Sequence, residues 1–177
     1  METIQVKDKK FGIFIPYARI QEVIDSMAVR LNRDLAEKNP LFVVVLNGAF
    51  VFAADIYRRL EFDSEISFVK LASYRGTQTT GVVRELIGLD NDLQGRTVVI
   101  LEDIIDSGYT MAYALKKFRE MGATEVLIAA LLFKPDAFKE NYKIDYLGME
   151  IPNDFIVGFG LDYDGHGRHY RDIYKVK

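Results

Sequence analysis

The residues most suited to chemistry lie where an apolar segment meets a short polar loop. Two adjacent carboxylates, Glu102 and Asp103, follow four apolar residues. The loop that comes next opens into an amphipathic helix and reads Asp106-Ser107-Gly108-Tyr109-Thr110. Free backbone N–H groups at such a helix start bind phosphate, whereas carboxylates beside a phosphate must bind hydroxyl groups or a divalent cation. Together these residues predict a site for a phosphorylated ribose and a metal ion.

The elements around this segment alternate between helical and extended patterns. Apolar residues at helical spacing predict a core-facing helix over 16–38. Two more helices are expected, over 50–60 and over 110–121, and Gly122 ends the second of them. Apolar runs predict strands at 41–46, 65–73, 97–103, 125–133 and 155–160.

This alternation predicts an α/β fold, in which a parallel twisted sheet of about five strands is flanked by helices. Ligands of such sheets bind beyond the carboxyl ends of the strands. The candidate residues close or follow strands: Asn47, Glu102, Lys134 and Asp162. We therefore expect them to gather along one edge of the sheet.

The composition predicts a soluble enzyme with a single domain, 1–177. The 177 residues are 49% apolar, which suffices for a core, and the net charge of −3 without a long basic run disfavours nucleic acid as a partner. No apolar run approaches the roughly 20 residues that span a bilayer, and the start shows no signal peptide, so we expect no membrane partner and a cytoplasmic location. The absence of cysteine excludes disulfides and thiolate metal sites.

The run from Glu102 to Gly108, behind its apolar strand, resembles the phosphoribosyl-pyrophosphate loop of type I phosphoribosyltransferases. Within that family it is most similar to the hypoxanthine and guanine branch. The resemblance implies the family's fold, with a small hood formed by the chain ends, about 1–15 and 135–177. It also implies Mg²⁺ as the cofactor and a homodimer or homotetramer.

The same resemblance assigns roles within the loop. Glu102 and Asp103 would hold the ribose hydroxyl groups and, partly through water, the metal ion. The stretch that follows would hold the 5′-phosphate: Asp106, Ser107, Gly108, Tyr109 and Thr110. Asp106 would also act as the catalytic base that takes the N7 proton of the purine. Tyr109 stands where relatives often carry lysine, so phosphate binding would depend on backbone N–H groups.

Two further loops resemble parts of the family's site. Leu46-Asn47-Gly48 is similar to its pyrophosphate loop, in which a non-proline cis peptide, here expected between Leu46 and Asn47, turns a backbone N–H to the ligand. Many relatives have a basic residue in place of Asn47, and the alternative interpretation is a simple Asn-Gly turn. Ser73-Tyr74, with the polar stretch that follows, resembles the loop that closes over the reacting centre. An exposed hairpin is the alternative there.

The purine site is expected from Lys134 and from Phe155-Ile156. An ammonium group has donors and no acceptor, so a lysine suits the 6-oxo group of hypoxanthine or guanine and not the amino group of adenine. By resemblance, Phe155 would stack on the base and the backbone carbonyl of Ile156 would accept from it. A solvated loop lysine and a core phenylalanine are the alternatives.

Asp162 and Arg168 complete the expected site. The resemblance implies that Asp162 reaches the metal on the pyrophosphate side, and that an arginine at the spacing of Arg168 binds pyrophosphate. Arg171 fits the local pattern nearly as well, so the choice stays open. His166 and His169 are interpreted as surface loop residues, because no matching set of metal ligands surrounds them.

The predicted reaction is Mg²⁺-dependent transfer of 5-phosphoribosyl from phosphoribosyl pyrophosphate to N9 of hypoxanthine, and of guanine, in purine salvage. One alternative is xanthine or another nucleobase as the acceptor. Another is a non-catalytic regulator that senses phosphoribosyl pyrophosphate, although the sequence shows no extra module or nucleic-acid surface. A dehydrogenase or small kinase lacks support, because neither a G-x-G-x-x-G nor a Walker sequence is present.

Overall fold

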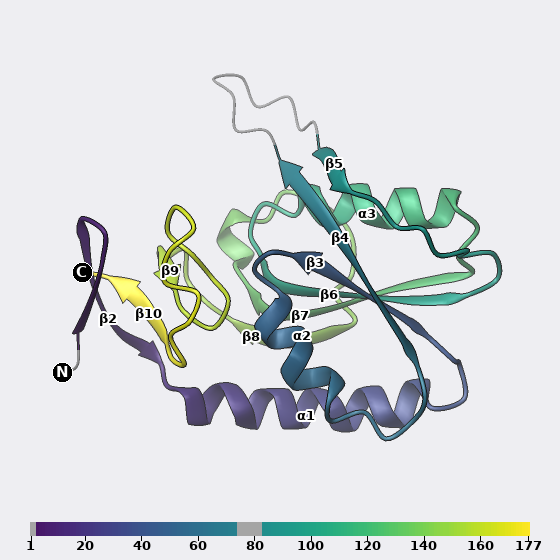
Figure 1. Cartoon of the computed structure of the whole chain (residues 1–177), viewed down its shortest axis with the longest axis horizontal. Coiled ribbons are helices and arrows are strands. Elements are labelled where there is room, and N and C mark those ends of the chain that lie inside the picture. The colour runs from purple at the N-terminus through teal and green to yellow at the C-terminus, as the bar shows by residue number, and fades with distance from the viewer. Residues whose placement is uncertain (1–2, 74–82) are drawn as a thin grey trace.

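A computed structural model describes residues 3–73 and 83–177, which form two β-sheets with helices packed on the larger one (Figure 1). The larger sheet has the strand order β5-β4-β3-β6-β7-β8. Its strands are Leu41–Leu46 (β3), Glu65–Ser73 (β4), Val83–Ile87 (β5), Thr97–Ile105 (β6), Glu125–Phe133 (β7) and Tyr146–Glu150 (β8). All neighbours pair in parallel except β4 and β5, which are antiparallel. The predicted fold class is therefore confirmed.

Helices cover both faces of this sheet (Figure 1). The helices α1 (Tyr17–Leu35) and α2 (Phe50–Tyr57) lie on one face, and α3 (Tyr109–Glu120) lies on the other. Side chains of β3 alternate between the two cores, so that Val44 packs with α1 and α2 whereas Val43 packs with α3. Burial on both faces explains why β3 is apolar throughout.

The helix α1 is amphipathic, as the spacing of its apolar residues predicts. Its buried stripe consists of Ile20, Val23, Ile24, Met27, Ala28, Leu31 and Leu35. The outer side carries charged residues such as Arg19 and Glu22, which form an exposed ion pair. Within residues 3–73 and 83–177, no helix combines the length and the apolar character needed to span a bilayer.

The smaller sheet is antiparallel and is built from both ends of the chain (Figure 1). Its order is β1-β2-β10-β9. The strands are Thr3–Val6 (β1), Lys9–Ile15 (β2), Ile156–Val157 (β9) and Ile173–Val176 (β10). Its own small core includes Phe11 and Tyr174. We call this sheet, together with Phe155 and the loop 158–172 that leads into β10, the hood.

The predicted strand at 155–160 requires a correction. Only Ile156–Val157 is extended, and it joins the hood instead of the parallel sheet. Gly158 and Gly160 both have positive φ angles, which end the strand after two residues. The fifth parallel strand is instead β8, which pairs with β7.

The carboxyl ends of the parallel strands meet at one edge of the sheet. The chain leaves the neighbouring strands β3 and β6 toward opposite faces of the sheet. The helix α2 connects β3 to β4 on one face, whereas α3 connects β6 to β7 on the other. Ligands of open α/β sheets bind at such a switch point. The predicted pyrophosphate and phosphoribosyl loops both start at it.

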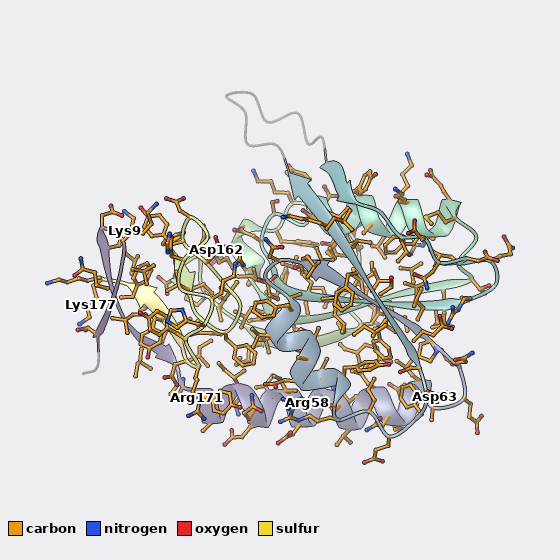
Figure 2. The ribbon with its side chains drawn as sticks, in the orientation of Figure 1. Lys9, Arg58, Asp63, Asp162, Arg171 and Lys177 are labelled. Atoms are coloured by element: carbon orange, nitrogen blue, oxygen red, sulfur yellow. The ribbon has the colours of Figure 1, made fainter. Side chains whose placement is uncertain are left out.

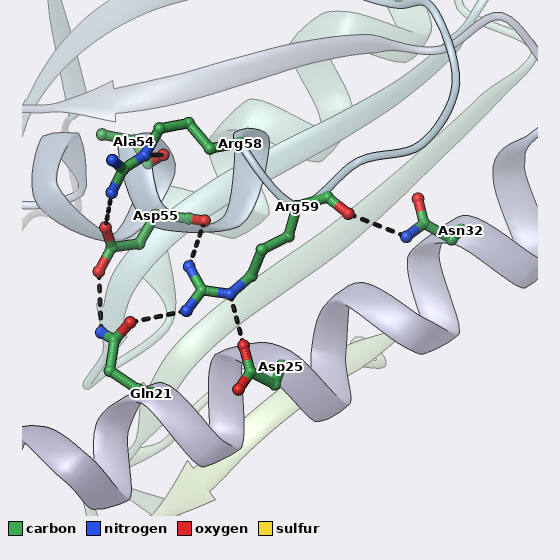
Figure 3. Close-up of polar contacts among 7 residues, drawn as sticks. All are labelled: Gln21, Asp25, Asn32, Ala54, Asp55, Arg58 and Arg59. Carbon is green, nitrogen blue, oxygen red and sulfur yellow. Dashed lines mark hydrogen bonds and ion pairs between the residues drawn. The ribbon is translucent and has the colours of Figure 1, made fainter.

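A polar network holds α2 on α1 (Figure 3). Arg59 donates to the side chain of Gln21 at 2.7 Å and to the backbone carbonyl of Asp55 at 2.8 Å, and it forms an ion pair with Asp25. Gln21 donates to the carboxylate of Asp55 at 2.9 Å, and Asp55 is only 7% exposed. The loop 46–49 leads directly into α2. By holding α2 on α1, this network therefore also fixes the end of that loop.

Candidate active site

The two carboxylates predicted to bind ribose and metal lie inside β6, which continues past the predicted end at 103 to Ile105. Both Glu102 and Asp103 are buried. Burial raises the pKa of the Glu102 carboxyl well above its ordinary value, and the neighbouring charge of Asp103 raises it further. Burial also raises the pKa of Asp103, although hydrogen bonds and the charge of Arg168 oppose this shift. Burial thus disfavours the charged forms of both carboxyls, and a bound cation or several hydroxyl donors would stabilise those forms.

The polar loop that begins at Asp106 turns β6 into α3. Gly108 has a φ of 90° at the N-cap of α3, and a Cβ at this position would lie 2.5 Å from the ring of Phe138 and 3.0 Å from the hydroxyl of Tyr142. Glycine is therefore required here. The helix begins at Tyr109, and its first turn, which is fully described, contains no acidic residue. Because the first backbone N–H groups of a helix have no partner within it, this end can bind an anion. Four side chains of the loop are partly exposed: Asp106, Ser107, Tyr109 and Thr110.

The loop after β3 contains the predicted cis peptide, between Leu46 and Asn47. Gly48 lies directly against Asp103, since a Cβ at position 48 would collide with that carboxylate. Gly160 of the hood lies against Gly48 in turn, since a Cβ at position 160 would collide with the carbonyl oxygen of Gly48. The backbone of the hood thus lies against the loop after β3, and that loop lies against the carboxylate of Asp103 in β6.

Arg168 lies in the hood next to this stack. Its guanidinium donates to the carbonyl oxygen of Gly160 at 2.6 Å and pairs with Asp162 at 2.8 Å. The second carboxylate oxygen of Asp162 accepts the backbone N–H of Gly165 at 2.6 Å. Figure 2 shows Asp162 between the small sheet and the large one. A pocket of about 390 Å³ opens beside Arg168 and reaches Phe50 at the start of α2.

The alternative arginine, Arg171, lies at the start of α1 (Figure 2). Its guanidinium stacks over the ring of Tyr17, 4.4 Å from the centroid. The adjacent Asp172 accepts the backbone N–H of Tyr17 at 2.6 Å and so caps α1, whose own N-cap residue is Pro16. Arg171 and Asp172 therefore support the packing of α1, and Arg168 is the one placed beside the candidate site.

Lys134 follows β7 and is buried, with 8% of its surface exposed. Its ammonium nitrogen lies 3.6 Å from the carboxylate of Asp106, and its backbone N–H donates to the carbonyl of Ile105 at 2.9 Å. The lysine predicted to bind the base and the predicted general base are thus neighbours, because β6 and β7 run side by side.

Phe155 and Ile156 lie in the hood. The ring of Phe155 is 43% exposed and meets the ring of Tyr163 edge-on, with centroids 5.5 Å apart. Ile156 lies opposite Lys175 of β10, whereas the carbonyl of Phe155 accepts the N–H of Val176. Hydrogen-bonded pairs alternate along an antiparallel ladder. The peptide groups of Ile156 are therefore directed away from β10, at the outer edge of β9.

The predicted closing loop is described only at its start. Ser73 is the last residue of β4 and lies at the same sheet edge as the other loops. Tyr74 lies outside the described residues, and so does the polar stretch as far as residue 82. The closing role of this loop stays a prediction.

The described residues contain no cluster of three or more His, Cys, Asp and Glu side chains able to hold a metal ion. His166 and His169 are exposed in the hood loop. Mg²⁺, however, binds well to one or two carboxylates when substrate phosphates and water complete its oxygen ligands. The buried pair Glu102 and Asp103 fits that requirement and would bind the ion together with a phosphorylated substrate.

Three residues that contact the phosphate loop were missed from the sequence: Phe138, Lys139 and Tyr142. They follow Lys134 in a segment that has no periodic pattern beyond the short helical turn Pro135–Ala137. The aromatic residues in an otherwise polar stretch were the available signal, because exposed loops seldom need large rings.

The fold and the site together define a class of enzyme that binds a phosphorylated sugar at the switch point of a parallel sheet. A family model described as "Phosphoribosyl transferase domain" matches residues 16–164. The chain therefore belongs to the phosphoribosyltransferase family.

Relatives within the family share most of the chain's length. A hypoxanthine-guanine phosphoribosyltransferase of Mycobacterium tuberculosis is 36% identical over 169 residues, which cover 92% of this chain and 82% of the relative. One of Bacillus subtilis is 35% identical over 162 residues, 91% of this chain and 88% of the relative. Among solved structures, a hypoxanthine phosphoribosyltransferase of Staphylococcus aureus is similar with a TM-score of 0.89 and 29% identity, covering 94% of this chain and 91% of that one. A hypoxanthine-guanine phosphoribosyltransferase of Bacillus anthracis gives 0.87 and 33%, covering 94% and 96%.

Proposed function

We propose that this chain transfers the 5-phosphoribosyl group from phosphoribosyl pyrophosphate to N9 of hypoxanthine and guanine, releasing pyrophosphate, in purine salvage in the cytoplasm. The observation that carries the proposal is the buried Lys134, 3.6 Å from Asp106 at the start of the phosphate loop. A buried ammonium group beside that loop suits an acceptor with an oxo group. The relatives' names, given above, support the same acceptors.

The donor would bind along the edge of β6. Glu102 and Asp103 would accept the ribose hydroxyl groups, and they would hold Mg²⁺ together with oxygens of the donor. The ion, when bound, neutralises charge on the pyrophosphate leaving group. The loop from Asp106 to Thr110 would bind the 5′-phosphate through the N–H groups at the start of α3.

Pyrophosphate would leave toward the hood. The turned peptide between Leu46 and Asn47 would offer a backbone N–H, and Arg168 would offer its guanidinium. Asp162 already holds Arg168 in place by an ion pair, so we assign Asp162 the orientation of that arginine as well as a water-mediated role near the metal. The stacking of Gly160, Gly48 and Asp103 keeps these groups close to the ribose.

The purine would lie between Lys134 and the hood. Lys134 would donate to its 6-oxygen, and the outward carbonyl of Ile156 would accept from its ring N–H. Phe155 would stack on its face, an interaction worth roughly 1–3 kcal/mol for bases on aromatic side chains. As the bond to pyrophosphate lengthens, the anomeric carbon gains positive charge, N9 approaches it, and Asp106 takes the proton from N7.

The active form would be a homodimer or homotetramer. The resemblance to the family supports this assembly, and exposed apolar residues such as Phe50 of α2 and Phe68 of β4, each 45% exposed, are available for an interface. Sedimentation velocity on the purified chain tests this directly. A monomer at micromolar concentration would contradict it.

An assay with phosphoribosyl pyrophosphate and Mg²⁺ tests the proposed reaction. Hypoxanthine, guanine, xanthine, adenine and uracil are offered separately. Turnover of hypoxanthine and guanine supports the proposal, and turnover of xanthine as well would broaden it. Turnover of adenine or uracil alone would contradict the role of Lys134. Donor binding without any turnover would favour a non-catalytic regulator.

A further inference from the structure

The segment that follows β7 runs along the phosphate loop and donates hydrogen bonds to backbone carbonyl groups at and before that loop. The backbone N–H of Lys134 donates to the carbonyl of Ile105 at 2.9 Å. The backbone N–H of Lys139 donates to the carbonyl of Ser107 at 3.1 Å, and the hydroxyl of Tyr142 donates to the carbonyl of Gly108 at 3.0 Å. We call residues 134–142 the strap.

Aromatic side chains fix the strap against the loop. The ring of Phe138 meets the rings of Phe133 and Tyr142 edge-on, with centroids 5.1 Å apart in both pairs. Phe138 and the hydroxyl of Tyr142 also fill the space beside Gly108 that a Cβ would need. The hydroxyl of Tyr142 is therefore held by packing in the position from which it donates.

These contacts fix the direction of backbone N–H groups in the phosphate loop. In a planar trans peptide the C=O of one residue and the N–H of the next point in opposite directions. Holding the carbonyl of Ser107 on the strap directs the N–H of Gly108 to the other side, and holding the carbonyl of Gly108 does the same for the N–H of Tyr109. Those N–H groups lie at the start of α3, where an anion binds.

We propose that Tyr142 is a positioning residue for the 5′-phosphate, acting through the carbonyl of Gly108. This inference rests on the proposed function, because it names what orients the phosphate loop of that same site. The carbonyl of Gly108 also accepts the N–H of Ala112 at 3.0 Å within α3. Tyr142 thus adds a second donor that ties the start of the helix to the strap and, through it, to Lys134.

The test is Tyr142→Phe in the full chain, which removes the hydroxyl and keeps the ring. We expect the Kd for ribose 5-phosphate and the KM for phosphoribosyl pyrophosphate to rise about fivefold, as for the loss of one neutral hydrogen bond. The Kd for pyrophosphate and kcat should stay within about twofold of the wild type. Tyr146→Phe is the matched control, because its hydroxyl contacts Asp34 at 3.4 Å, away from the loop.

Unchanged ribose 5-phosphate affinity in Tyr142→Phe, while turnover remains, would overturn this inference and leave the proposed function standing. Equal losses for ribose 5-phosphate and pyrophosphate would also overturn it, because a general loosening of the fold produces that result. Selective loss of ribose 5-phosphate binding in a chain that turns over no base would support the inference and contradict the proposed function. A wild-type chain that does not bind ribose 5-phosphate contradicts both.

A second variant guards against poor folding of the first. Lys139→Pro removes the backbone N–H that binds the carbonyl of Ser107, and the preceding Phe138 already has the extended ψ of 132° that a following proline requires. The same selective loss of ribose 5-phosphate affinity is expected. Unaltered affinity in a folded Lys139→Pro protein would contradict a role for the strap.

Discussion

At the scale of single residues, Glu102 and Asp103 place negative charge inside a buried strand. Burial raises the pKa of both carboxyls. A raised pKa in the folded state gives stability that is complete below the unfolded value and is lost as the pH rises through the folded value. For Glu102, with an ordinary value of 4.5, the free protein therefore loses stability as the pH rises toward neutrality and above. The buried carboxylates thus lower the stability of the free protein, and they provide ligands for a cation and for the ribose hydroxyl groups.

The variant Glu102→Gln tests whether this carboxylate lowers stability and binds the donor. At pH 8, without ligand, its unfolding temperature should exceed that of the wild type, and the difference should shrink near pH 4, where the wild-type carboxyl is protonated. Its affinity for phosphoribosyl pyrophosphate with Mg²⁺ should fall about tenfold or more, because hydrogen bonds to a charged group are lost. Thermal scans with and without ligand measure both effects. The exposed Glu61→Gln should change neither, and a less stable Glu102→Gln at pH 8 would refute the argument.

The variant Asp106→Asn tests the catalytic base. It keeps the size of the side chain and removes both the proton acceptor and the charge 3.6 Å from Lys134. We expect kcat for hypoxanthine to fall about 100-fold, at the lower end of general-base effects. The KM for the donor should change less than about twofold. Steady-state kinetics measure both, with the exposed Asp136→Asn as the control, and an unaltered kcat would remove Asp106 from this role.

At the scale of elements, the sequence predicted the helices and strands that have a clear local pattern of apolar residues. Strands β3, β4 and β7 have the predicted bounds. For β3 the signal is an all-apolar run, which marks a strand buried on both faces. The edge strand β8 was missed because Tyr146 is its only buried residue and because the strand includes Gly148. The predicted strand at 155–160 was wrong because two glycines with positive φ interrupt it.

Contacts between distant parts of the chain were beyond sequence reasoning. The phosphate loop and the cis peptide could be predicted because short motifs carry them. The cap that Asp172 supplies to Tyr17 joins residues far apart in the chain, and no local pattern records such a pairing. The contact of Tyr142 with Gly108 is of the same kind.

The cap on α1 leads to a prediction about this element. Asp172→Ala removes the acceptor for the N–H of Tyr17, and no side chain at Pro16 replaces it. The protein should lose about 1 kcal/mol of unfolding free energy, or about 2–4 °C in Tm for a chain of this size. Differential scanning calorimetry measures the change. The exposed Asp63→Ala should have no effect, and equal Tm values for the two variants would contradict the capping role.

At the scale of the whole molecule, the chain ends and the sheet edge are joined into one unit. Asp172 of the hood caps α1 of the large sheet, and Gly160 of the hood lies against Gly48. We therefore predict that the residues 1–177 unfold as one domain. A single calorimetric transition with equal calorimetric and van't Hoff enthalpies is expected. Two resolved transitions would show that the hood melts separately.

The stacking of Gly160 on Gly48 and of Gly48 on Asp103 also bears on how this enzyme can be re-engineered. Phe155 and Ile156, which are proposed to contact the base opposite Lys134, sit in the hood, so exchanging the hood between relatives is one route to a new base preference. The two glycines leave no free space at this contact. A transplanted hood with a side chain at position 160 would collide with the backbone of Gly48 in the loop after β3. A working chimera must therefore keep glycine at position 160, or take the hood and the loop 46–49 from the same parent.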